Sequence, residues 1–324
     1  MTSSAVSAHR THRVRSRCVL AAVLTLTSGS VWAQTAGPDR ATLEQRLATA
    51  EATQDWAGAL DAALTLNEEA EEGHLEALYR IARLHALLGH ADRAYEFLER
   101  VQQAGLFDVQ RVRRDEAFAS LRDEPRFKAV TQAIWLKGYL WILERPERDA
   151  YQQPDRVMEV LAFRTGERVA DVGAGSGYFT RRISRAVGPG GAVWAVDIRA
   201  EILAVLEERA RREGLTNVRL QQVQPDDPRL PAGGIDTILL VDTLHYVKAR
   251  GDYAKRLRAA LAPGGRVVII DFVPKPLEER PWGPPPEQKM SREEVDAAMA
   301  EAGLFPARVH DFLTEQFFVE YRPR

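Results

Sequence analysis

The chain has 324 residues, of which 45% are hydrophobic and 28% are charged, and its formal net charge at pH 7 is −2. This length is sufficient for two domains with separate cores, and the composition is that of a globular protein. The near-neutral charge provides no basic surface across the whole chain, so a nucleic-acid partner is not indicated. The single cysteine, Cys18, excludes both a disulfide framework and a thiolate metal site.

Residues 1–33 have the composition of a secretory leader. They contain no acidic residue, and four arginines precede an apolar run from Cys18 to Leu26. Residues 31–33, Val-Trp-Ala, then form a segment typical of a signal-peptide cleavage site. The apolar run is shorter than the ~20 residues that a membrane span requires. We therefore predict a signal peptide over 1–33 and a periplasmic or secreted mature chain without a membrane span, with a cytoplasmic protein as the alternative.

Residues 38–145 are predicted to be helical throughout. Apolar residues recur at helical spacing from Leu75 to Leu88 and again from Ala94 to Val101, and a glycine follows each run. The pair at residues 59–60 matches the pair at 94–95 at an offset of 35 residues, close to the tetratricopeptide period of about 34 residues. The pattern predicts a tetratricopeptide-like domain that binds a protein partner. An irregular helical bundle without a binding role is the alternative.

The polar segment 145–149, which contains a proline, is the predicted domain boundary. Beyond it, short β-rich runs alternate with amphipathic helices, which predicts a doubly wound, mostly parallel α/β sheet of the Rossmann-like kind. The five predicted strands are Arg168–Val172, Ala192–Ile198, Val218–Val223, Ile235–Val241 and Arg266–Phe272. A capping box at residues 291–294 opens the last helix, and the segments Ala307–Phe312 and Phe317–Tyr321 are predicted to close the fold as an antiparallel pair of strands.

A glycine-rich turn follows the first predicted strand. The strand ends in Asp171, and Gly173, Gly175 and Gly177 come next. Glycine permits a sharp turn and lets a ligand approach the backbone closely, and the N-terminus of the following helix offers free amide donors. A dinucleotide-binding fingerprint would need a glycine where Tyr178 stands, so the spacing argues against a nicotinamide-dependent enzyme of the same fold.

This Asp-x-Gly-x-Gly-x-Gly pattern resembles motif I of class I S-adenosylmethionine-dependent methyltransferases. The resemblance also includes Gly177–Thr180 and the segment Lys289–Val295 before the last helix. It implies a methyltransferase domain over residues 149–324 whose glycine turn holds the methionine end of S-adenosylmethionine. In such enzymes the acid corresponding to Asp171 binds the methionine amino group.

The resemblance assigns further cofactor contacts to the ends of later strands. Asp197, 20 residues after the last glycine of the turn, would accept hydrogen bonds from the ribose hydroxyls, with Ile198 beside the adenine. In the loop after the third strand, Asp226 or Asp227 would receive the adenine amino group. Asp242 closes the fourth strand, at the carboxyl edge where ligands bind open α/β sheets. Each residue alone is equally compatible with a turn or a cap, but their order along the strand ends favours the cofactor.

His245 is the candidate group that acts on the methyl acceptor. Methyl transfer from a sulfonium is an in-line displacement with an activated leaving group, so alignment and a dry pocket supply most of the catalysis. A histidine three residues past Asp242 can take a proton near neutral pH, and a histidine that only lines the pocket is the alternative. The proline-rich segment 274–286 is predicted to cover the acceptor site, with a linker without contacts as the alternative.

The acceptor is predicted to be a small molecule or a protein. The Asn/Asp-Pro-Pro-aromatic signature of nucleic-acid amino methyltransferases is absent after the fourth strand, where residues 242–245 read Asp-Thr-Leu-His. The favoured function is an active methyltransferase whose helical domain recruits or positions a partner. The alternative is a tetratricopeptide adaptor that keeps a methyltransferase fold and binds a ligand without turnover. Export conflicts with the first hypothesis, since S-adenosylmethionine is not made outside the cytoplasm.

Overall fold

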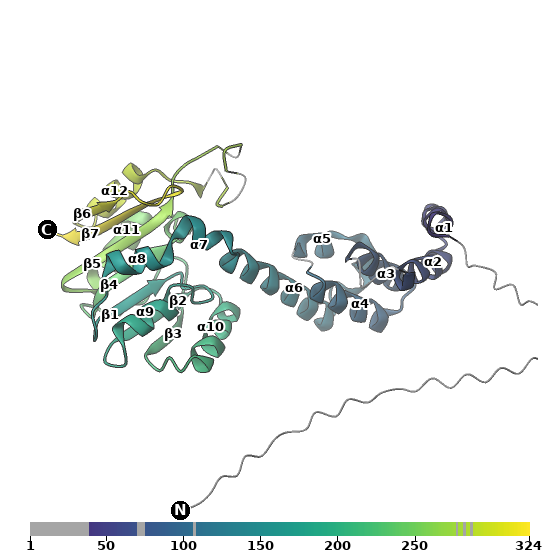
Figure 1. The fold of residues 1–324 in the computed structure, drawn as a ribbon, viewed down its shortest axis with the longest axis horizontal. Helices are drawn as coiled ribbons and strands as arrows, with labels where there is room; N and C mark the ends of the chain where they lie inside the picture. Colours follow the sequence, from purple (N-terminus) through teal and green to yellow (C-terminus); the bar gives the residue numbers. More distant parts are fainter. Residues whose placement is uncertain (1–38, 70–74, 106–107, 277, 281–282, 286–287) are drawn as a thin grey trace, which may run out of the picture.

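The computed structural model describes residues 39–324 except 70–74, 106–107, 277, 281–282 and 286–287 (Figure 1). The predicted signal peptide over 1–33 lies outside the described residues. Figure 1 shows a helical part and a part built around a sheet, joined by the long helix α6. Within the described ranges, every helix is too short or too polar to cross a membrane.

The helical part is built from packed helix pairs. Helix α1 packs against α2, and α3 packs against α4. Ala59 and Ala94, the small residues at equivalent positions of the predicted repeat, are both fully buried, which lets neighbouring helices approach closely. A helical region is therefore confirmed, while its tetratricopeptide type stays a prediction. Its elements are α1 (Arg40–Ala52), α2 (Trp56–Glu69), α3 (Leu75–Leu87), α4 (Ala91–Gln103), α5 (Val109–Arg114), η1 (Glu116–Leu121) and α6 (Pro125–Glu144).

The second part is a seven-stranded sheet with helices on both faces. The strand order is β3-β2-β1-β4-β5-β7-β6; β1 to β5 are parallel, and β7 pairs antiparallel with β5 and β6. This topology confirms the predicted fold class, including the closing antiparallel pair. The elements are α7 (Glu147–Gln152), α8 (Pro154–Leu161), β1 (Arg168–Val172), α9 (Thr180–Val187), β2 (Ala192–Asp197), α10 (Ala200–Arg212), β3 (Val218–Gln222), β4 (Ile235–Val241), η2 (Leu244–Tyr246), α11 (Arg250–Ala260), β5 (Leu261–Phe272), α12 (Arg292–Ala300), β6 (Leu304–His310) and β7 (Gln316–Pro323).

The strands follow from their residue patterns. Ile238, Leu239 and Leu240 are successive and all fully buried, as expected for a central strand that is covered on both faces. Strand β5 begins at Leu261, earlier than predicted, because residues 261–265 stay extended beside β4 through an irregular stretch of the register. The chain order reverses between β1 and β4, and ligands of open α/β sheets bind beyond the carboxyl ends of the strands at such a point.

Candidate active site

The turn between β1 and α9 has a left-handed backbone at all three predicted glycines. The φ angles of Gly173, Gly175 and Gly177 are +79°, +53° and +88°, a region that favours glycine. A Cβ on Gly173 would lie 2.1 Å from Thr243 Oγ1, and one on Gly177 would lie 2.2 Å from Leu206 Cδ1. Side chains at these positions would therefore push the turn away from the sheet edge.

Two predicted carboxylates flank this turn. Asp197 Oδ2 accepts a hydrogen bond from the Gly175 amide at 2.9 Å, and its Oδ1 accepts one from the Arg199 amide at 3.0 Å. Because a carboxylate oxygen has two acceptor positions, both oxygens can still receive a ligand hydroxyl. Asp171 is buried and accepts a hydrogen bond from Thr180 Oγ1 at 2.5 Å. Burial raises the pKa of Asp171 to about 6, although the Thr180 hydrogen bond opposes the rise.

The predicted adenine contacts follow β2 and β3. Ile198 is 44% exposed, so an apolar side chain lies uncovered next to Asp197. Asp227 Oδ1 accepts a hydrogen bond from the Arg229 amide at 2.9 Å, and its other oxygen lies 3.4 Å from Arg256 Nη1. Asp227 therefore shapes its own loop, whereas Asp226 beside it is exposed. Of the two acids, Asp226 is the better placed to receive a ligand.

Asp242 lies at the end of β4 within a buried polar network. Its φ is +51°, Gln316 Nε2 donates to its Oδ1, and Arg148 Nη2 lies 3.9 Å from its Oδ2. Gln152 Nε2 in turn donates to Gln316 Oε1 at 2.9 Å. Burial raises the pKa of Asp242 to about 7, with Arg148 opposing the rise. A fraction of these carboxyls is therefore protonated at neutral pH in the ligand-free protein.

We expect the Asp242→Asn variant to gain stability relative to wild type as the pH rises. The folded protein retains a proton on Asp242 up to about pH 7, whereas an unfolded chain loses it near pH 4. Between these two pH values the free energy of unfolding therefore falls, because Asp242 is ionised in the unfolded chain and protonated in the folded protein. Asparagine tolerates the positive φ and can accept the same hydrogen bond from Gln316. The melting temperature of the variant minus that of wild type should grow from about pH 5 to about pH 8; a constant difference would contradict the raised pKa.

The predicted domain boundary at 145–149 contributes side chains to this edge of the sheet. Arg148 is buried, its Nη1 donates to the Leu143 carbonyl at 2.6 Å, and its guanidinium lies 4.0 Å from the centre of the Tyr178 ring. The Tyr178 hydroxyl donates to Asp149. Neither Arg148 nor Asp149 is among the predicted site residues, because a polar segment with a proline is typical of a linker.

His245 forms a buried pair with Asp271. His245 Nδ1 lies 2.7 Å from Asp271 Oδ1, and the His245 amide donates to Asp271 Oδ2 at 3.2 Å. The side chains of the two residues are only 3% and 1% exposed. An ionised carboxylate only accepts hydrogen bonds, so with Asp271 as acceptor a neutral imidazole has its proton on Nδ1 and a lone pair on Nε2. Nε2 has no hydrogen-bond partner among the residues that the structure describes.

Asp271 is not among the predicted site residues. It follows the apolar run Val267–Ile270 near the end of β5, which is the same kind of position that Asp242 occupies after β4. The sequence does contain a signal for Asp271, because a polar residue directly after an apolar run marks the carboxyl edge of the sheet.

Aromatic rings surround His245. The ring centre of Tyr246 lies 4.1 Å from that of His245, the ring of Phe272 lies 6.4 Å away, and Tyr151 lies 5.9 Å from Phe272. The guanidinium of the buried Arg280 lies 4.8 Å from the Phe272 ring and donates to a backbone carbonyl just after β5 at 2.7 Å. The described residues of the proline-rich segment therefore contact this region, which excludes a linker without contacts.

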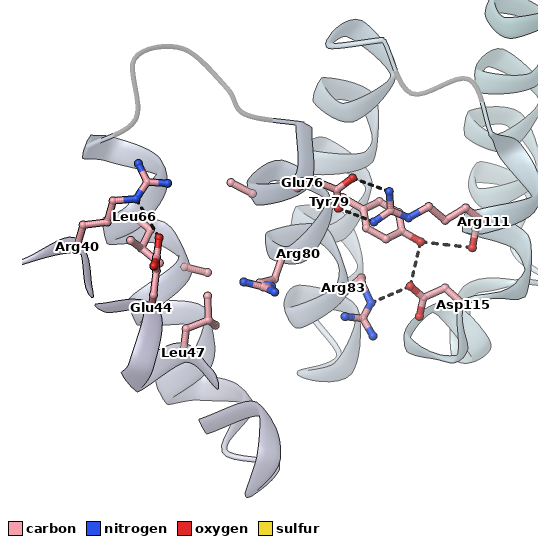
Figure 2. Close-up of a pocket in the computed structure, with 12 residues that line it drawn as sticks. Arg40, Glu44, Leu47, Leu66, Glu76, Tyr79, Arg80, Arg83, Arg111 and Asp115 are labelled. Carbon is pink, nitrogen blue, oxygen red and sulfur yellow. Dashed lines mark hydrogen bonds and ion pairs between the residues drawn. The ribbon is translucent and has the colours of Figure 1, made fainter. Parts of the chain in front are cut away.

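A cavity lies in the helical part, between α1, α2, α3 and α5 (Figure 2). Three of its arginines, Arg40, Arg83 and Arg111, pair with carboxylates that line the same cavity. Both Nη atoms of Arg111 donate to Glu76 at 2.6 Å, and Arg83 Nε lies 2.7 Å from Asp115. The predicted protein partner of the helical domain would have to compete with these ion pairs, and that partner stays a prediction.

Comparison with known proteins identifies the sheet-containing part. Residues 169–265, which include the glycine turn and the ends of β1, β2 and β4, match the family of methyltransferase domains. This part of the chain has a methyltransferase fold. This match and a similar solved structure of a methyltransferase confirm the predicted cofactor of the domain, S-adenosylmethionine.

Similar curated proteins and a similar solved structure each match part of this chain. The ubiquinone/menaquinone biosynthesis C-methyltransferase UbiE of Pseudomonas savastanoi pv. phaseolicola is 33% identical over 116 residues, which are 36% of this chain and 45% of that protein. The protein of the same name from Stutzerimonas stutzeri is 32% identical over the same shares. The chain thus spans about 45% of the length of these curated relatives. A solved S-adenosylmethionine-dependent methyltransferase from Aquifex aeolicus has a TM-score of 0.51 and 28% identity, covering 55% of this chain and 94% of its own.

Proposed function

We propose that the chain is an active S-adenosylmethionine-dependent methyltransferase in which His245 removes a proton from the acceptor. The cofactor fits the residues present. Asp197 retains acceptor positions for the ribose hydroxyls, the exposed Ile198 offers an apolar surface for adenine, and Asp226 is available for the adenine amino group. The positive charges of the cofactor suit the buried carboxyls of Asp171 and Asp242, which ionise near neutral pH.

The observation that carries the proposed chemistry is that His245 Nε2 has no hydrogen-bond partner among the described residues. When bound, S-adenosylmethionine supplies an electrophilic methyl group. His245 Nε2 would accept the proton that the acceptor loses, and Asp271 would stabilise the resulting imidazolium through Nδ1. A carboxylate that orients the imidazole and pairs with its charge makes a buried histidine a more effective base. The surrounding rings would exclude water from the acceptor.

We propose a hydroxylated aromatic ring as the acceptor. A flat ring can pack against Tyr246 and Phe272, which lie next to His245, and against Tyr151, which lies next to Phe272. Its hydroxyl must lose a proton to become a good nucleophile, which is the step that His245 can assist. The names of the curated relatives describe C-methyltransferases in the biosynthesis of quinones, which are ring compounds, and this supports a ring as the acceptor.

Calorimetry and a turnover assay on the full chain test this function. We expect saturable binding of S-adenosylhomocysteine, followed by its formation from S-adenosylmethionine with catechol or hydroquinone as acceptor. Benzene-ring compounds without a hydroxyl serve as controls and should give no product. Absence of S-adenosylhomocysteine binding would overturn the enzyme assignment. Binding without turnover on any hydroxylated ring would favour the alternative, a ligand-binding adaptor that keeps the fold.

A further inference from the structure

The amino-terminal half of α6 belongs to the core of the helical part. Phe127, Val130 and Ile134 are buried in the same apolar cluster as the residues of α2, α3 and α4. Lys137 Nζ also donates to the carbonyl oxygens of Gln102 and Gln103, at 2.7 and 2.9 Å. These bonds tie the middle of α6 to the carboxyl end of α4, whose carbonyls a lysine is well suited to satisfy.

The carboxyl end of α6 contacts the glycine turn of the methyltransferase domain. Glu144 accepts a hydrogen bond from Ser176 Oγ at 2.6 Å and forms an ion pair with Arg209 of α10. Arg209 Nη1 also donates to the Ser176 carbonyl at 3.1 Å. A Cβ on Gly175 would lie 3.2 Å from Leu143 Cδ1, so Leu143 packs directly against the turn. Figure 1 shows α6 running without a break between these two sets of contacts.

Aromatic residues of α6 lie beside the end of β2. The rings of Trp135 and Tyr139 stack with centres 5.3 Å apart, and the Arg199 guanidinium lies 4.8 Å and 5.4 Å from the two centres. The backbone of Arg199 is bonded to Asp197, the predicted ribose ligand. Burial raises the pKa of Tyr139, and the charges that act on it include those of Asp197 and Tyr246. Tyr139 therefore lies beside the end of β2, next to the side chain of Arg199.

We infer that the carboxyl half of α6 forms a wall of the cofactor site, with the Tyr139 ring covering the cofactor and Glu144 positioning the glycine turn. This inference rests on the proposed function. The cofactor would extend from the glycine turn to Asp197. The glycine turn contacts Leu143 and Glu144 of α6, and Arg199, which follows Asp197 closely, contacts Tyr139. The helical part is then a structural component of the binding site, because it anchors the helix that completes it.

Titration of the full-length protein with S-adenosylhomocysteine by calorimetry tests this inference. Tyr139→Ala should weaken binding by about tenfold through the lost aromatic contact, and Tyr139→Phe should bind within about twofold of wild type. Glu144→Ala should also weaken binding, while Glu144→Gln, which can still accept from Ser176, should weaken it less. Lys128→Ala is the matched control on the same helix and should leave binding unchanged, because Lys128 is exposed on the half of α6 that packs in the helical part.

Hydrogen exchange supplies a second measurement that a merely structural role would not change. In the wild type, S-adenosylhomocysteine should slow amide exchange in residues 135–144 as well as in the glycine turn. Absence of binding by the wild type would overturn the proposed function itself. Normal binding by Tyr139→Ala and Glu144→Ala, or a ligand that protects the glycine turn and leaves residues 135–144 unchanged, would overturn only the inference about α6. Melting temperatures of the ligand-free variants identify any that fail to fold. If a variant fails to fold, hydrogen exchange in the wild type decides whether α6 contacts the ligand.

Discussion

Replacing Asp197 with alanine is expected to weaken the binding of S-adenosylhomocysteine by at least about 100-fold. Two ribose hydroxyls would lose a charged acceptor, and hydrogen bonds to charged groups contribute about 1.5–3 kcal/mol each, where 1.4 kcal/mol corresponds to tenfold in affinity. The substitution also removes the acceptor of the Gly175 amide, so the glycine turn loses a contact that fixes its position.

Asp236→Ala is the matched control for this experiment. Asp236 is also an acid on the sheet, but it lies at the amino end of β4, where its Oδ1 is 2.9 Å from Arg168 Nη2. We expect its replacement to leave the affinity within about twofold of wild type, because a lost surface ion pair affects stability by about 1 kcal/mol or less. Calorimetry measures both dissociation constants. Wild-type affinity in Asp197→Ala would show that the ribose does not bind at the end of β2.

Replacing His245 with alanine is expected to lower the turnover of a phenolic acceptor by about 100- to 10,000-fold, the usual contribution of a general base. The affinity for S-adenosylhomocysteine should stay close to that of wild type, since His245 pairs with Asp271 and lies among aromatic rings rather than at the glycine turn. Asp271→Asn should also lower turnover, because an amide cannot stabilise the imidazolium as a carboxylate does.

Acceptors of different acidity test whether His245 acts as a base or only fills space beside the acceptor. A nitrated catechol ionises at a lower pH than catechol and has less need of a base, so His245→Ala should impair its methylation less than that of catechol. An equal loss on both acceptors would contradict the role of His245 as a base. His90→Ala, a change to an exposed histidine of the helical part, should leave both rates unaffected.

Local sequence patterns were sufficient to predict the sheet and one side of the site. Strands β1 and β4 have the bounds that their apolar runs predict, and the capping box of Ser291 and Glu294 opens α12. Asp197 and Asp242 could be assigned to one edge because the carboxyl ends of parallel strands meet there. The glycine spacing likewise predicted a sharp turn, and all three glycines have the positive φ angles that favour this residue.

Contacts between residues far apart in the chain could not be predicted in this way. His245 and Asp271 are 26 positions apart, and Gln152 and Gln316 are 164 positions apart, so no periodicity or spacing connects either pair. Even where the type of residue was suggestive, as with Asp271 after its apolar run, the partner depended on which strands became neighbours.

The sequence by itself determined the methyltransferase fold, the glycine turn between β1 and α9, and the row of acids at the strand ends. These features depend on local backbone preferences and on the alternation of apolar and polar residues, which act over a few neighbouring positions. Only the tertiary structure decided that Asp271 orients His245, that Arg148 lies beside Asp242, and that α6 reaches the glycine turn. The first two contacts result from packing within the sheet-containing part, and the third from packing of α6 against it. Burial also raises the pKa of Asp242.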